Sequence, residues 1–111
     1  MRLLLDTHII LWVASQPSRI PADCRVLLND ADNRLYFSAA SLWEIAIKHS
    51  LGRADFQVNA RALYRGLINN GYQELAIRSQ HSLAVDRLPA IHKDPFDRIL
   101  IAQATVEDIL F

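Results

Sequence analysis

The sequence predicts an α/β fold in which helices cover both faces of a central parallel sheet. Residues 3–5, Leu-Leu-Leu, form a short apolar run that ends at Asp6, as in a strand buried on both faces. Strand and helix patterns then alternate along the chain, which implies crossover connections and a parallel sheet. Hydrophobic residues make up 51% of the 111 positions, so we expect one core and a single domain over residues 1–111.

The elements can be placed in order. After the strand at 3–5, apolar residues at positions 9, 10, 12 and 13 favour a short helix over 8–14. Pro21 suits the first turn of a second helix, which ends near 29–33. Leu35-Tyr36-Phe37 is typical of a second strand. The remaining expected elements are helices over 41–50, 59–68, 80–88 and 95–107, a strand over 72–77 and the start of a fourth strand at 109–111.

Composition excludes several classes of protein. Lys plus Arg equals Asp plus Glu at 12 each, so no overall charge attracts nucleic acid, and local bases such as Lys48, Arg61 and Arg98 would have to bind phosphate. Cys24 is the sole cysteine, which excludes an internal disulfide and a cysteine-based zinc site. We expect Cys24 to be a small core residue. With no export signal and no apolar run of about 20 residues, we expect a soluble cytoplasmic protein that does not enter membranes.

Three acids fall where parallel α/β folds bind ligands, at a strand end or in the first turn of a helix that follows a strand. They are Asp6, Glu44 and Asp97. Each acid also has a structural alternative. Asp6 suits a helix cap, Ser41-x-x-Glu44 matches a capping box, and Asp94-Pro95 ahead of Asp97 matches a capped helix start with an acid at the positive end of the dipole.

The three acids together indicate a metal site more strongly than any one of them. In this topology their positions share one edge of the sheet, and carboxylates packed close repel one another unless a cation neutralises them. Without thiolates or a pair of histidines at ligand spacing, the set suits Mg²⁺ or Mn²⁺. Such an ion can polarise a phosphodiester and activate water for hydrolysis. We expect the scattered histidines and the two tryptophans to be surface or packing residues, with the tryptophans in the core: His8, His49, His81, His92, Trp12 and Trp43.

Three motifs, in this order, resemble the PIN-domain family, especially its bacterial VapC-like toxins. They are Leu-Leu-Leu-Asp-Thr-His at 3–8, Ser-Ala-Ala-Ser-Leu-Trp-Glu-Ile at 38–45 and His-Lys-Asp-Pro-Phe-Asp-Arg at 92–98. Their order and spacing match over essentially the whole chain.

The resemblance implies a three-layer Rossmann-like fold and a metal-dependent endoribonuclease toxin that cleaves RNA with Mg²⁺ or Mn²⁺. It also implies a homodimer and a cognate antitoxin that neutralises the activity. By motif position, Asp6, Glu44 and Asp97 are the expected catalytic and metal-binding acids, with Asp94 as a further metal ligand. Thr7 and Ser41 are the expected hydrogen-bond partners of these ligands.

One departure from the family leaves a second interpretation open. Members usually continue past 109–111 into a Thr-x-Asp-like segment with another acid and a last strand, whereas this sequence ends at Phe111. The alternative is therefore a catalytically incomplete PIN-like domain that only binds a partner protein. A phosphoacceptor domain is disfavoured because Thr7 and His8 follow Asp6 where a second acid is required, and His8 also excludes an Asp-x-Asp phosphatase.

Overall fold

The computed structural model describes residues 1–89 and 94–111. Its strands are β1 (Arg2–Leu4), β2 (Arg34–Ser38) and β3 (Gln73–Leu75), which form a parallel sheet in the order β1-β2-β3. The α-helices are α1 (Thr7–Ser15), α2 (Ala22–Asn29), α3 (Ala39–Ser50), α4 (Ala60–Asn69), α5 (Ser79–Ala84) and α6 (Pro95–Glu107). Short 3₁₀ helices are η1 (Pro17–Arg19), η2 (Ala54–Phe56) and η3 (Val85–Arg87). No helix in these two ranges is long and apolar enough to cross a bilayer.

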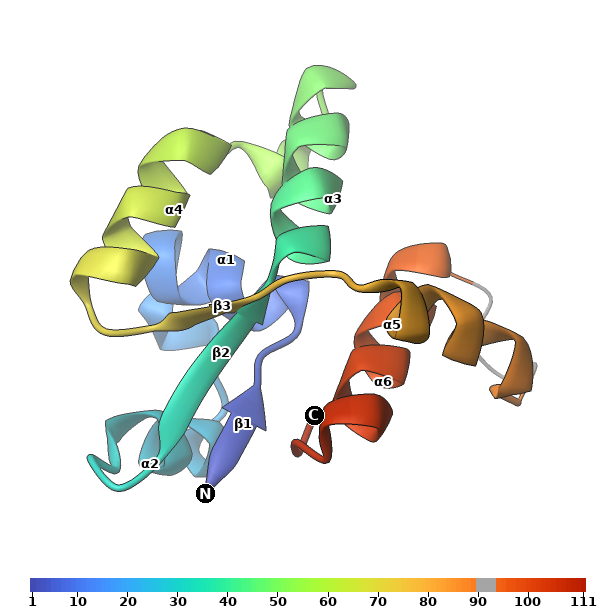
Figure 1. Ribbon diagram of the computed structural model, residues 1–111. Helices are drawn as coiled ribbons and strands as arrows, with labels where there is room; N and C mark the ends of the chain where they lie inside the picture. The colour runs from blue at the N-terminus through green and yellow to red at the C-terminus, as the bar shows by residue number, and fades with distance from the viewer. Residues whose placement is uncertain (90–93) are drawn as a thin grey trace.

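The sheet lies between two helical layers (Figure 1). Side chains alternate along each strand, so Phe37 of β2 packs in a cluster with residues of α1, α3 and α4. Its neighbour Tyr36 and the paired Leu4 of β1 pack instead against Leu100 and Ala104 of α6. The predicted α/β fold, with a parallel sheet covered on both faces, is confirmed.

Three helices begin at the carboxyl edge of this sheet. β1 leads into α1 through Asp6, and β2 leads directly into α3 through Ser38. α6 runs back toward the amino edge, where the Arg2 guanidinium donates to the carbonyl of Glu107 at 2.9 Å. Its first turn therefore lies at the carboxyl edge, and Phe96 there contacts Trp43 of α3 with ring centroids 5.2 Å apart.

Two buried polar side chains fix α6 in this position. His81 Nδ1 accepts from the Arg78 backbone N–H at 2.9 Å, so Nε2 carries the ring hydrogen and donates to Glu107 at 2.7 Å. The Gln103 side chain donates to the carbonyl oxygens of residues 75 and 76 and accepts from the Ser38 hydroxyl at 2.6 Å. Gln103 therefore ties α6 to the ends of β2 and β3.

Several expectations about individual elements need correction. β3 is shorter than expected, and the helix predicted over 80–88 is α5 followed by the tighter η3 turn. The fourth strand is represented by one parallel bridge between Leu3 and Leu110. Cys24 was expected in the core but is only half-buried, as α2 carries no fully buried residue. Trp43 was also expected in the core but is 60% exposed.

Candidate active site

A buried polar cluster joins α1 to α3 at the carboxyl edge. The Thr7 hydroxyl donates to Glu44 Oε1 at 2.7 Å and is hydrogen-bonded to the Ser41 hydroxyl at 3.0 Å. All three side chains are buried, and Glu44 is only 3% exposed. A carboxylate in such a place needs compensating partners, and the Thr7 hydroxyl, itself held by Ser41, supplies part of that compensation and fixes the orientation of the carboxylate.

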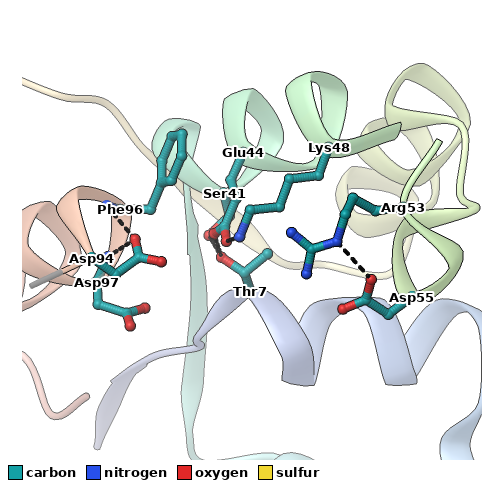
Figure 2. A network of polar contacts seen from close by, with 9 residues as sticks. All are labelled: Thr7, Ser41, Glu44, Lys48, Arg53, Asp55, Asp94, Phe96 and Asp97. Carbon is teal, nitrogen blue, oxygen red and sulfur yellow. Dashed lines mark hydrogen bonds and ion pairs between the residues drawn. The ribbon is translucent and has the colours of Figure 1, made fainter. Parts of the chain in front are cut away.

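The remaining compensation comes from Lys48, one turn further along α3. Its Nζ lies 2.6 Å from Glu44 Oε2, and the two side chains are 19% and 4% exposed, respectively. Figure 2 shows the Glu44 carboxylate between the Thr7 hydroxyl and this ammonium. From the sequence, Lys48 is expected only as one of the local bases that could bind phosphate. Lys48 follows Glu44 by four residues, which is the spacing of an ion pair on a helix, so this spacing could have predicted the contact.

The capping-box interpretation of Ser41 and Glu44 is wrong. The N-cap of α3 is Ser38, whose hydroxyl oxygen accepts from the Ala40 N–H at 3.0 Å. Because the helix begins three residues earlier than a Ser41 cap would require, Ser41 and Glu44 lie inside it and take no part in capping. Their burial and mutual contact through Thr7 therefore need an explanation other than helix capping.

Asp6 lies at the carboxyl end of β1 and caps α1. Its Oδ1 accepts from the Ile9 N–H at 2.9 Å, so the cap predicted for Asp6 is confirmed. The cap uses one carboxylate oxygen, and a carboxylate can accept from or coordinate with its second oxygen as well. Asp6 directly precedes Thr7 and is half-buried at the same edge of the sheet.

The two acids of the third motif lie at the start of α6. Asp94 is the N-cap and accepts from the N–H groups of Phe96 at 2.8 Å and Asp97 at 3.4 Å. Asp97 is exposed in the first turn, as expected for an acid at the positive end of the helix dipole. Figure 2 shows both carboxylates on α6 beside the segment of α3 that carries Glu44. His92 and Lys93 of this motif lie outside the described residues.

Other candidate groups have partners of their own or are exposed. His8 contacts the rings of Trp12 and Phe56, and His49 is hydrogen-bonded to the carbonyl of residue 56. The Arg98 guanidinium donates to the carbonyls of residues 85 and 89, whereas Arg61 and Arg65 are exposed on α4. Arg61 and Arg65 are therefore more accessible to a ligand in solvent than Arg98.

The side chains at the edge are of the kind that binds a hard divalent cation. Carboxylates and hydroxyls are the donors that Mg²⁺ and Mn²⁺ prefer, and all of them come from elements that meet at one sheet edge. Within residues 1–89 and 94–111, however, no three acidic, histidine or cysteine side chains come close enough to hold a metal ion together. Glu44 is instead neutralised by Lys48.

Comparison with known families decides the classification. A sequence model of the PIN domain matches residues 3–111. The chain belongs to the PIN-domain family. PIN domains are generally metal-dependent nucleases, and they generally use divalent ions. No curated protein and no solved structure matches the chain in the corresponding comparisons.

Proposed function

We propose that this PIN domain is an endoribonuclease that uses Mg²⁺ or Mn²⁺ held by Asp6, Glu44 and Asp97, with Asp94 as a further ligand. The observation that carries the proposal is Glu44. It is a buried carboxylate at the carboxyl edge, it is oriented by Thr7, and it has no capping role in its own helix. Burying a carboxylate costs free energy, which Thr7 and Lys48 offset in the structure, and a carboxylate oriented in this way at the carboxyl edge is suited to bind a divalent cation.

The surrounding residues support this chemistry. Thr7, which is hydrogen-bonded to Ser41, holds Glu44 in one orientation, and Asp6 and Asp94 cap the first turns of α1 and α6. The positive ends of the dipoles of α1, α3 and α6 lie at this edge, where they favour a negatively charged phosphate. A bound divalent ion would supply Lewis-acid activation of the phosphodiester and of a water molecule.

RNA cleavage by the purified chain tests the proposal. We expect internal cleavage of single-stranded RNA with Mg²⁺ or Mn²⁺ and none after addition of EDTA, which removes the ion. New 5′ ends mapped by sequencing would locate the cut sites. Binding of RNA or of a protein partner without cleavage at any metal concentration would favour the alternative, a PIN-like domain that only binds.

We further propose that the enzyme is a toxin of a toxin–antitoxin system and acts as a homodimer. The support is the resemblance of the three sequence motifs to VapC-like toxins. Expression in a bacterial host should then stop growth, whereas the Asp6→Asn variant at the same protein level should not. Equal growth with both proteins would contradict the toxin role, and light scattering of the purified chain tests the dimer.

A further inference from the structure

Lys48 stands out because it neutralises the acid to which the proposed function assigns the metal ion. Most ion pairs four residues apart on a helix are exposed and contribute little to stability. This pair differs because the Glu44 side chain is only 4% exposed and the N···O distance is 2.6 Å. A buried carboxylate loses most of its hydration, so the ammonium beside it replaces water as the compensating partner.

Aromatic rings hold the Lys48 ammonium in this position. Its Nζ lies 4.9 Å from the centre of the Phe56 ring and 5.9 Å from that of Phe96, within the range of cation–π attraction. Phe96 lies in the first turn of α6, between Asp94 and Asp97. The ammonium therefore lies between α3 and the acidic start of α6 (Figure 2).

We propose that Lys48 is the internal counter-ion of the metal site: its ammonium neutralises Glu44 when no divalent cation is bound and is displaced when one binds. The inference rests on the proposed role of Glu44 as a metal ligand. Glu44 Oε1 accepts from Thr7 and Oε2 faces Lys48, so direct coordination through Oε2 requires the ammonium to leave. The side chain of Lys48 is 19% exposed, so solvent can take up the displaced charge.

Competition of this kind lowers the apparent affinity for metal. A site whose binding-competent state is populated in only a fraction of molecules binds its ligand more weakly by that fraction. Removing the ammonium should therefore tighten metal binding, and it should also leave the buried Glu44 without its partner in metal-free protein. If Lys48 is a counter-ion, its removal tightens metal binding and lowers the stability of the metal-free protein. If Lys48 is an ordinary stabilising residue, its removal only lowers stability.

The test compares Lys48→Met with the wild type by Mn²⁺ titration and thermal unfolding. Methionine keeps the unbranched chain that packs against Phe56 and Phe96 but removes the charge. In EDTA we expect the variant to unfold roughly 10 °C below the wild type, because an unpaired buried charge is costly. With Mn²⁺ alone as the probe, we expect its dissociation constant to be at least tenfold lower, and saturating Mn²⁺ to restore most of the lost melting temperature.

Two further variants make the outcome specific. Arg53→Met removes a cation that lies just beyond the end of α3. Arg53 pairs with Asp55 at 3.5 Å and not with Glu44, so the affinity for Mn²⁺ should change less than threefold. Combining Glu44→Gln with Lys48→Met should recover the melting temperature lost in metal-free Lys48→Met, because the neutral amide needs no counter-ion.

The results distinguish this inference from the proposed function. If Glu44→Gln weakens Mn²⁺ binding but Lys48→Met binds no tighter than the wild type, the counter-ion role is wrong and the metal site stands. If Lys48→Met binds more tightly but no protein cleaves RNA, the counter-ion role stands and the nuclease proposal fails. If no protein binds Mn²⁺, both are overturned.

Discussion

Asp6→Asn should reduce Mg²⁺-dependent RNA cleavage about a thousandfold or more while leaving the fold intact. Asparagine caps helices as well as aspartate, so α1 keeps the contact that Asp6 makes with the Ile9 N–H. The neutral amide is nevertheless a much weaker metal ligand. A metal ion contributes several kcal/mol to such reactions, and each 1.4 kcal/mol or so is a factor of ten in rate. Initial rates on a fluorescent RNA substrate give the loss, and circular dichroism checks the fold.

Asp32→Asn provides the matched control. Asp32 lies in the turn before β2, at the amino edge of the sheet, where the Met1 amino group contacts only its backbone carbonyl. The same chemical change there should leave the cleavage rate within about twofold, since metal effects fall off away from the coordinating groups. If the Asp6→Asn variant cleaved RNA as fast as the Asp32→Asn variant, Asp6 would not be a metal ligand.

Phe37→Ala should lower the free energy of unfolding by about 3–5 kcal/mol, the cost of truncating a large buried aromatic side chain. Phe37 is fully buried in β2, and its ring packs edge-on against Tyr64 with centroids 6.1 Å apart. The change leaves a cavity between the sheet and the helices α1, α3 and α4, whose packing the remaining side chains cannot restore. Urea denaturation followed by circular dichroism measures the loss.

Val26→Ala is the comparison for this experiment. Val26 is 70% exposed on α2, so its truncation removes little buried surface and should change stability by less than about 0.5 kcal/mol. If the two variants unfolded at the same urea concentration, the cluster around Phe37 would not be the core that holds the sheet to its helices.

The fold could be predicted from sequence because its strongest signals are local. The cap at Asp94 followed by Pro95 gave α6 with the bounds observed, and the apolar run at 3–5 gave the buried strand β1. The predicted start of α3 is too late because Ser38 and Ser41 are both residues that cap helices well. Which of them caps the helix depends on where β2 ends, and the local sequence does not show this. Trp43 was misplaced because helical periodicity does not show that α3 turns this residue outward against Phe96.

The site was only partly predictable for a related reason. Thr7 and Ser41 were expected near the acids, and in the structure Thr7 is hydrogen-bonded both to Glu44 and to Ser41. The role of Lys48 was missed because an ion pair at this spacing is usually a surface feature, and burial of Glu44 becomes visible only when α1 and α3 are packed together. The distance between the Asp6 and Asp97 carboxylates depends on how helices far apart in the sequence pack together. No local sequence pattern determines that packing.

The location of Mn²⁺ in crystals soaked with this ion tests the account most directly, because manganese can be identified by its anomalous scattering. We expect one strong anomalous peak at the carboxyl edge, coordinated by Glu44 and Asp6 with Asp97 or Asp94, and the Lys48 ammonium moved away from Glu44. A crystal with saturating Mn²⁺ in which Glu44 remains paired with Lys48, and in which no ion lies at that edge, would contradict the assignment of these acids as the metal site.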